Sequence, residues 1–416
     1  MAKKFSIPEM YQSPVIRTVK EHNQILDPRK KNLKPSVLDF GPVRFLIPRH
    51  FGFCYGVQNA IDIAYRTVEE HSDKNIYLLS EMIHNPDVNE DLQKKGVKFL
   101  FETDGTEIIP LTNLSTDDIV IVPAFGTSLE IQAKLESAGI DPYKYDTTCP
   151  FVEKVWKRGK QIGKKGYSLV IHGKYWHEET RATFSHAKAV SPSIVVLNVE
   201  EARMLAEFML EKRPIEEFEE QFGMKCSEGF DPRTDLERFG VINQTTMLAT
   251  ETEEVMAVLK EATVEKYGEE DLKKHFADTS DTLCYATNEN QSATLALLEE
   301  EADVAIVVGG YNSSNTMHIV ELLEHKFPTY HIRNVDEIDG SQSVSHFNQW
   351  DKKMHTTENW FPLEKENDEP ITVAITSGAS CPDKLVDEII LEITSWFGGA
   401  KDLDEAMEPF RKTVEA

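Results

Sequence analysis

The chain has 416 residues, a hydrophobic fraction of 40%, a charged fraction of 28% and a formal net charge of −26. This length predicts two or three domains with buried cores, and the composition is typical of a globular protein in water. The acidic excess argues against a nucleic-acid partner, because phosphate binding needs a basic surface. No apolar run approaches a membrane span and the first residues hold no apolar signal core, so we expect neither membrane insertion nor secretion.

The chain is expected to alternate strands and helices after an N-terminal extension. Residues 1–40 are rich in Pro, Lys and Arg and show no clear period. The expected strands are Val43–Ile47, Ile76–Leu79, Ile119–Val122, Ser168–Ile171, Val241–Ile242, Val304–Val308 and Thr372–Ile375. The expected helices are Val57–Glu70, Val88–Lys95, Leu129–Ala138, Phe151–Ile162, Thr252–Tyr267, Ser292–Glu301, Met317–His325 and Lys384–Phe397. Repeated strand–turn–helix units predict an α/β fold with parallel sheets.

Three segments interrupt this alternation. We interpret the charged stretch 210–238 and the polar, aromatic-spiked stretch 336–370 as surface insertions, and residues 398–416 as a C-terminal tail. The first insertion carries Cys226, which we take as structurally incidental.

The chain contains five cysteines, whose spacing resembles no small disulfide framework and indicates a reducing compartment. Cys54, Cys149 and Cys284 each follow an apolar run and precede a predicted helix. Three thiolates from separate segments suit an iron–sulfur cluster in which one iron stays open as a Lewis acid. Alternatively, Cys149, which precedes Pro150, is not a ligand and serves as a small buried hydrophobic residue.

Distinctive polar motifs occur where a predicted strand stops and a helix starts. They are His84-Asn85, Phe125-Gly126-Thr127-Ser128, His172 to Thr180, Asn243-Gln244-Thr245-Thr246, Gly309 to Asn315 and Thr376 to Pro382. Ligands bind at such strand ends, and helix N-termini there suit phosphate, so this neutral donor set predicts a site for a multiply charged oxyanion. Taken singly, Ser313, Asn315 and Ser380 are more often helix caps than ligands. The chain has no Gly-x-x-x-x-Gly-Lys-Ser/Thr loop, which argues against a nucleotide site.

Several of these motifs resemble one known family. Gly52-Phe53-Cys54-x-Gly56-Val57, Thr147-Thr148-Cys149-Pro150, Asn243 to Thr246, Cys284-Tyr285-Ala286-Thr287, Asn312 to Asn315 and Ser377 to Ser380 are similar, in order, to 4-hydroxy-3-methylbut-2-enyl diphosphate reductase, the IspH or LytB family. The resemblance implies three αβα domains in a pseudo-three-fold trefoil around a central 4Fe–4S cluster. Their expected bounds are 41–54 with 284–397, 55–149 and 150–283.

The resemblance also implies the chemistry and the site. The reaction would be the reductive dehydroxylation of the allylic diphosphate to isopentenyl and dimethylallyl diphosphate, the last step of the non-mevalonate pathway. Ferredoxin or flavodoxin would donate the electrons, in the cytoplasm or, in a plant, the plastid stroma. Cys54, Cys149 and Cys284 would ligate the cluster, leaving one iron open. The residues implied to bind substrate are His84, His177, Thr245, Ser313, Ser314, Asn315 and Ser380. Glu179 would relay a proton, and Thr245 would order the substrate and a water.

The sequence departs from the family pattern in two places. Phe125 occupies a turn where the family commonly has His, and Gly173 to Trp176 lengthen the loop before His177, as in the longer plant and bacterial form. Lys174 is a candidate replacement for the missing imidazole. We also expect the acidic donor to dock on the basic helix after Cys149, which carries Lys154, Lys157, Arg158, Lys160, Lys164 and Lys165, although a solvated helix face explains these residues equally well.

Two other readings stay open at this point. One is a different three-cysteine iron–sulfur enzyme, such as an aconitase-like hydro-lyase, which needs no electron donor. The other is a non-enzymatic Cys₃ metal site or a redox-sensing protein.

Overall fold

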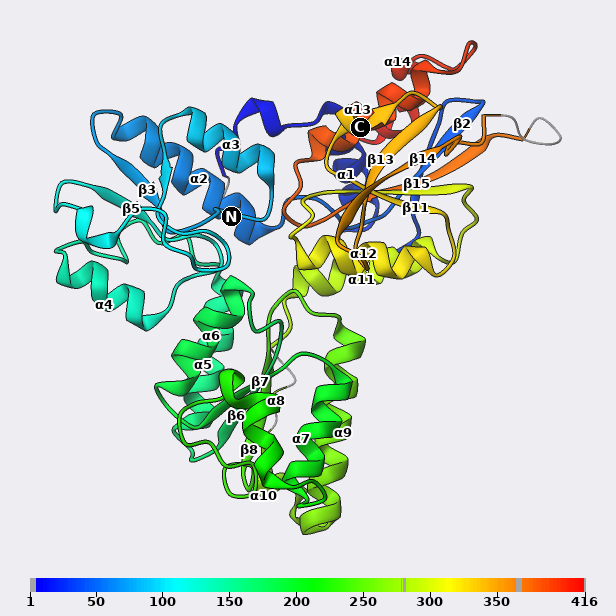
Figure 1. Ribbon diagram of the computed structural model, residues 1–416. Coiled ribbons are helices and arrows are strands. Elements are labelled where there is room, and N and C mark those ends of the chain that lie inside the picture. The colour runs from blue at the N-terminus through cyan, green and yellow to red at the C-terminus, as the bar shows by residue number, and fades with distance from the viewer. Residues whose placement is uncertain (1–4, 278, 280–281, 364–368, 415–416) are drawn as a thin grey trace. The chain divides into compact units, whose positions relative to one another are not determined.

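The computed structural model describes residues 5–277, 279, 282–363 and 369–414 (Figure 1). The chain divides into two compact units. Unit 1 comprises Met1–Gln58, His84–Pro86 and Tyr285–Ala416, and unit 2 comprises Asn59–Ile83 and Asp87–Cys284. The three-domain boundaries expected from the sequence stay a prediction.

Unit 1 is built on a five-stranded sheet in the order β1-β2-β15-β10-β11. The strands are β1 (Ser36–Asp39), β2 (Val43–Ile47), β10 (Val304–Val308), β11 (Thr329–Ile332) and β15 (Ile371–Ser377). All neighbours are parallel except β1 and β2. Strands β10 and β15 are buried along their whole length, as the continuous apolar runs predict for parallel strands covered on both faces.

Helices cover both faces of this sheet. Alternate residues of β10 point to opposite faces, so Ile306 belongs to one core and Val307 to the other. The first core also receives residues of α1 (Pro14–Leu26), α13 (Asp383–Ser395) and α14 (Leu403–Val414), and the second receives residues of α11 (Tyr285–Leu297) and α12 (Ser314–Glu324). The boundary between the units falls inside α2 (Tyr55–Glu70).

Within the described residues, the expected extension and the expected tail each contain a helix that packs in unit 1. Within the expected extension, α1 buries Val15, Ile16 and Val19 in the first core. Within the expected tail, α14 buries Met407 and Phe410 there. The apolar residues Val15, Ile16 and Val19 recur at helical spacing, a signal that the sequence analysis missed, and their packing partners include residues from the far end of the chain.

The second expected insertion forms a small antiparallel sheet of unit 1. Its strands are β12 (Ile338–Asp339), β13 (Ser343–Asn348) and β14 (Lys353–Glu358), in the order β12-β13-β14. Val344 and Trp360 belong to the first core of unit 1, so the segment is only partly a surface feature.

Unit 2 contains two further parallel sheets. One has the order β4-β3-β5, from β3 (Ile76–Leu78), β4 (Lys98–Phe99) and β5 (Ile119–Ile121). The other has the order β7-β6-β8-β9, from β6 (Ser168–His172), β7 (Ser193–Val196), β8 (Phe239–Asn243) and β9 (Phe276–Ala277). The accompanying helices are α3 (Pro86–Lys94), α4 (Leu129–Ser137), α5 (Pro150–Gly163), α6 (Glu178–Lys188), α7 (Val199–Met209), α8 (Phe218–Phe222), α9 (Ala249–Tyr267) and α10 (Leu272–His275). Short 3₁₀ turns lie in unit 2 at Leu111–Asn113, Ile215–Glu217, Gly223–Lys225 and Glu269–Asp271, and in unit 1 at Glu9–Tyr11 and Val335–Glu337.

The α/β class with parallel sheets is confirmed, and each expected strand overlaps an observed one, with ends that differ by up to two residues. The expected helix Ser292–Glu301 is wrong at both ends, because α11 begins at Tyr285 and ends at Leu297. The stretch 210–238 is not only a surface insertion, since Phe218, Phe222 and Phe230 are buried in a core of unit 2.

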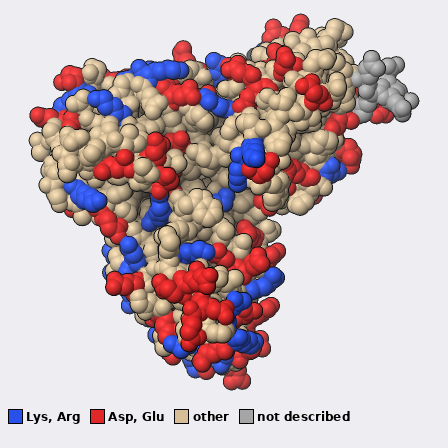
Figure 2. Space-filling model, viewed as in Figure 1, with Lys and Arg blue, Asp and Glu red and all other residues tan. Residues whose placement is uncertain are grey.

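The charge distribution on the surface agrees with the composition, which contains many acidic and basic residues. Acidic and basic side chains are interspersed over the face seen in Figure 2. Over the residues that the structure describes, every helix is too short or too polar to cross a membrane.

Candidate active site

In unit 1, two polar loops follow adjacent strands of the sheet. Residues 309–313 connect β10 to α12, and residues 378–382 connect β15 to α13. Since β10 and β15 are parallel neighbours, their loops emerge at the same edge. Ser313 is the N-cap of α12, where its hydroxyl accepts from the Thr316 N–H at 3.3 Å. Ser314 and Asn315 are buried in the first turn of the same helix.

Asn315 links the two loops through its side-chain oxygen, while its side-chain nitrogen has no hydrogen-bond partner among the described residues. Its Oδ1 accepts from the Ala379 N–H at 2.8 Å. Its Nδ2 is buried and has no hydrogen-bond partner among the described residues, and neither do the hydroxyls of Thr376 and Ser377 at the end of β15. Buried donors without partners are costly, and an anion at this sheet edge would satisfy them. The sequence analysis did not select Thr376 and Ser377 as ligands, although two hydroxyl residues ending a buried strand were a usable signal.

The loop that contains His84 packs against both of these loops. The Ser380 hydroxyl donates to the His84 carbonyl at 3.1 Å. Gly310 lies so close that an added Cβ would be 2.5 Å from the same carbonyl, so only glycine fits there. The Cys54 N–H donates to Ala379 O at 3.2 Å. Unit 1 therefore brings Cys54, His84, Asn315 and Ser380 to one edge of its sheet.

The antiparallel insertion supports the 309–315 loop from its other side. The Tyr311 ring stacks on Phe347 of β13, with centroids 4.8 Å apart, and its hydroxyl donates to Glu337. His331 of β11 packs edge-on against Tyr311, and one of its ring nitrogens lies 3.0 Å from Gly309 O. Burial lowers the pKa of His331 to about 4, so this ring is neutral at pH 7.

Unit 2 carries the candidate acid. Glu179 lies in the first turn of α6 and is 2% exposed. Its Oε1 accepts from the Thr245 N–H at 2.6 Å and its Oε2 accepts from the Thr245 hydroxyl at 2.9 Å. His177 caps α6, and its Nδ1 accepts from the Glu179 N–H at 3.2 Å. The structure therefore joins the three residues His177, Glu179 and Thr245, which come from the ends of β6 and β8.

Both departures from the family pattern lie beside this group. The Phe125 ring packs edge-on against His177, with centroids 5.6 Å apart, so it supports the imidazole by packing. The Lys174 N–H donates to Gln244 Oε1 at 3.0 Å, which ties the longer loop to the end of β8. A phosphate contact by the Lys174 ammonium stays a prediction.

Each of the three candidate cluster ligands stands at the start of a helix. Cys149 is the N-cap of α5, and α2 and α11 begin directly after Cys54 and Cys284. The positive end of a helix dipole favours a thiolate. Cys54 belongs to unit 1, and Cys149 and Cys284 belong to unit 2. Within the described residues, no three His, Cys, Asp or Glu side chains are grouped as metal ligands, so the ligand set stays a prediction.

The other two cysteines are poor ligand candidates. None of the five cysteines forms a disulfide. Burial raises the pKa of Cys226 to about 11, which keeps it protonated at neutral pH, and Cys381 is part of the first core of unit 1.

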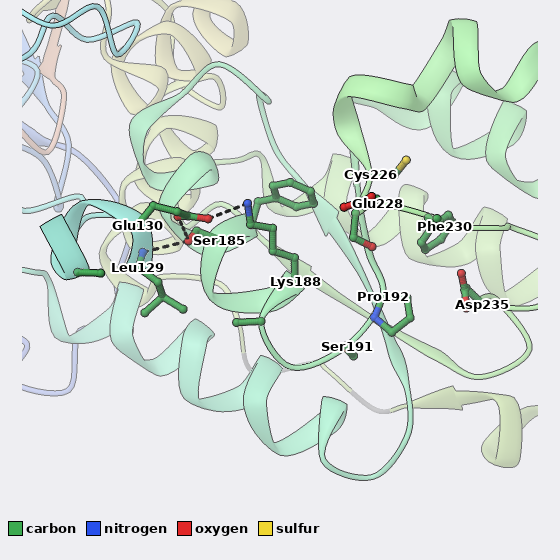
Figure 3. A pocket seen from close by; sticks show the side chains of 15 residues that line it. Leu129, Glu130, Ser185, Lys188, Ser191, Pro192, Cys226, Glu228, Phe230 and Asp235 are labelled. Atoms are coloured by element: carbon green, nitrogen blue, oxygen red, sulfur yellow. Dashed lines mark hydrogen bonds and ion pairs between the residues drawn. The ribbon is translucent and has the colours of Figure 1, made fainter.

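One cavity of unit 2 is separate from these motifs. It measures about 980 Å³ and lies between α4, α6 and the loop around Cys226 (Figure 3). In this cavity Glu130 pairs with Lys188 at 2.8 Å and accepts from the Ser185 hydroxyl at 2.6 Å. Because Glu130 and Lys188 are paired with each other and the lining holds none of the selected residues, we do not place the site here.

Comparison with known proteins points to the same family as the sequence motifs. Residues 45–394 match the family model described as LytB protein. The 4-hydroxy-3-methylbut-2-enyl diphosphate reductase of Trichormus variabilis is 39% identical over 92% of this chain and 89% of its own length. The same-named protein of Thermosynechococcus vestitus is 41% identical over 85% of each chain. A solved structure of (E)-4-hydroxy-3-methyl-but-2-enyl diphosphate reductase covers 83% of this chain and 97% of its own, at 25% identity and a TM-score of 0.50. A reductase structure from Plasmodium falciparum has a TM-score of 0.56 at 21% identity, a likeness of fold.

Proposed function

The chain belongs to the LytB family, and from this premise we propose that it reduces 4-hydroxy-3-methylbut-2-enyl diphosphate to isopentenyl and dimethylallyl diphosphate. In this reaction the substrate takes up two electrons and two protons, its C–O bond breaks and its hydroxyl leaves as water. The observation that carries the proposal is the buried, unpartnered Asn315 amide at the N-terminus of α12. It is the neutral, pre-positioned donor that a diphosphate requires.

The diphosphate is bound by neutral donors at helix N-termini. Ser313, Ser314 and Asn315 begin α12, and Ser380 precedes α13. His84 and His177 add imidazole donors. Free backbone N–H groups and the helix dipole stabilise phosphate oxygens without a dedicated cation.

Cys54, Cys149 and Cys284 are proposed to hold a 4Fe–4S cluster. Their positions at three helix starts fit thiolate ligands. With three protein ligands, one iron is left to act as a Lewis acid toward the substrate oxygen.

Glu179 is proposed to deliver the proton to the leaving hydroxyl. Hydroxide is a poor leaving group, so a positioned acid is needed. Thr245 holds both carboxylate oxygens through its N–H and hydroxyl, and this fixes the orientation of the carboxyl. The same hydroxyl is proposed to order the substrate and a water beside it.

The electrons are proposed to come from ferredoxin or flavodoxin, delivered one at a time. The basic helix α5 remains one candidate docking surface.

The test is an anaerobic preparation in which iron, sulfide and the optical spectrum are measured with and without substrate. Turnover is then assayed with reduced methyl viologen. We expect about four irons per chain, a spectral change on adding substrate and turnover that depends on reductant. Turnover without reductant would favour a hydro-lyase, and zinc in place of iron would favour a structural metal site.

A further inference from the structure

A cavity of about 430 Å³ in unit 1 lies directly beside Cys54. One wall is formed by Phe53, Cys54 and Tyr55 and another by Tyr285 and Glu289 of α11. Tyr55 and Tyr285 each directly follow a candidate cluster ligand and are 41% and 42% exposed. The cavity is therefore an opening from the surface to a residue next to the proposed redox centre.

The remaining wall is formed by the N-terminal segment. Lys20 and Lys30 line the cavity together with Cys54. The Lys20 ammonium donates to Phe51 O at 2.8 Å and pairs with Asp383 at 2.7 Å. Arg49 donates to Asn23 Oδ1 at 2.8 Å and to Asn23 O at 3.1 Å. These bonds fix α1 against the loop that leads to Cys54, so the wall is a defined surface.

The outer rim of this wall is basic and partly apolar. Between Asp27 and Pro35 the chain carries four exposed cations, Arg29, Lys30, Lys31 and Lys34. Lys30 pairs with Glu289 at 3.0 Å and Lys34 lies 3.9 Å from Glu300, so Arg29 and Lys31 are the two that form no ion pair among the described residues. Ile25 and Leu26, which precede them, are 52% and 64% exposed. We call residues 25–34 the basic rim. In a chain with a net charge of −26, such a positive, partly apolar strip is suited to an acidic protein partner.

The alternative surface on α5 is partly explained by its own helix. Lys157 pairs with Glu153 at 2.6 Å, one turn away. Lys160 lies in the last turn, where the helix dipole favours a cation. Lys164 follows Cys149 by fifteen residues, which corresponds to roughly 22 Å along a helix. By contrast, Lys30 and Cys54 line one cavity.

We propose that the basic rim is the docking surface for the acidic one-electron carrier protein that supplies this enzyme. The inference rests on the proposed function and adds the place of electron entry, over the cavity lined by Cys54, Tyr55 and Tyr285. Each encounter oxidises one carrier by one electron. Two encounters supply the two electrons that, with two protons, reduce one substrate molecule and release its hydroxyl as water.

The test compares two double charge reversals in the full-length holoenzyme under anaerobic conditions. Arg29→Glu/Lys31→Glu alters the basic rim at two exposed cations outside the substrate and cluster machinery. Lys160→Glu/Lys164→Glu changes the net charge equally on α5. The probe is an acidic plant-type [2Fe–2S] ferredoxin. Its Kd is measured by calorimetry in the oxidised form, and its KM in turnover.

We expect the rim variant to weaken ferredoxin binding about tenfold at low salt, and the difference to shrink at high salt as the charges are screened. Turnover with methyl viologen should stay within about twofold of wild type. The α5 variant should bind ferredoxin like wild type. An unchanged Kd for the rim variant, or an equal or larger loss in the α5 variant, would overturn the proposal.

A Leu26→Ser variant tests the apolar part of the rim. It should also weaken ferredoxin binding while sparing turnover with methyl viologen. If the wild-type holoenzyme shows no turnover with methyl viologen, the proposed function fails, whereas the docking surface is still judged by the Kd values.

Discussion

Glu179 accepts two hydrogen bonds from Thr245 and is almost fully buried, so the orientation of its carboxyl is fixed. We predict that Glu179→Gln lowers turnover by about 10²–10⁴, which is typical for the loss of a positioned acid. Substrate binding should change little, because the amide keeps the size of the side chain. The measurement is kcat with methyl viologen together with the substrate Kd.

The control for this change is Glu178→Gln, its buried neighbour, which accepts a hydrogen bond from Ser80. Turnover in this control should stay within about tenfold of wild type, since Glu178 has no role in the proposed proton transfer. Near-normal turnover in Glu179→Gln would remove Glu179 from the mechanism.

Asn315 is predicted to act through its unpartnered Nδ2. Asn315→Asp keeps the oxygen that accepts from Ala379 but replaces the donor with an anionic oxygen. Repulsion and the lost hydrogen bond should raise the KM for substrate by about 10²-fold or more. Inhibition by inorganic diphosphate should weaken in parallel. If both constants are unchanged, the diphosphate does not lie at the start of α12.

At the scale of elements, the β12–β14 sheet is predicted to position the 309–315 loop. Phe347→Ala removes the ring that stacks on Tyr311. Such a pair is worth about 0.5–1.5 kcal/mol, so the substrate KM should rise up to about tenfold. The kcat should be nearly preserved, and Phe347→Tyr should restore the KM.

Trp350→Ala is the matched control, because Trp350 lies beside the same strand pair but is 68% exposed and donates to Glu324. It should leave the KM unchanged. Equal effects of both substitutions, or a fall in kcat alone, would contradict a positioning role for this sheet.

The junction of α1 and α13 has its own pH dependence. Burial raises the pKa of Asp387 to about 6, against the bonds that its carboxylate accepts from Ser13, Val15 and Ile16. The folded state therefore binds the proton more tightly than the unfolded state, and the contribution of Asp387 to stability falls as the pH rises through the range of about 4 to 6.

We predict that wild type loses about 1 kcal/mol of unfolding free energy relative to Asp387→Asn between pH 5 and pH 7.5. Urea unfolding of both proteins at the two pH values measures this difference. A difference of the opposite sign would show that Asp387 is not buried as described.

At the scale of the whole molecule, the three proposed cluster ligands are divided between the units, with Cys54 in unit 1 and Cys149 and Cys284 in unit 2. We predict that Cys54→Ala, Cys149→Ala and Cys284→Ala each lose most of the iron after anaerobic reconstitution, because a three-thiolate site cannot spare a ligand. Cys226→Ala and Cys381→Ala keep the iron and serve as matched controls. Iron and sulfide analysis of the five proteins decides the ligand set, and retained iron in any of the first three would exclude that residue.

Much of the fold was predictable because its signals are local. The apolar runs of β10 and β15 and the capping residue Ser313 specify strand, turn and helix within short windows. The helix α1 was missed although its N-cap Ser13, its Pro14 and the spacing of Val15, Ile16 and Val19 are local signals as well. What no local window contains is its junction with α13, where Asp387 accepts from the Ser13 hydroxyl across 374 residues of sequence.

The sequence by itself therefore determined the chemical groups and their places at strand ends and helix starts, since a cap or a strand end depends on neighbouring residues. Only the tertiary structure decided which groups meet. It joined Glu179 to Thr245, Asn315 to Ala379 and Tyr311 to Phe347, and it set the N-terminal helix beside Cys54. The physical reason is that these contacts form only after distant segments pack together. The chain entropy lost in that packing is offset by the burial of hydrophobic cores to which several segments contribute.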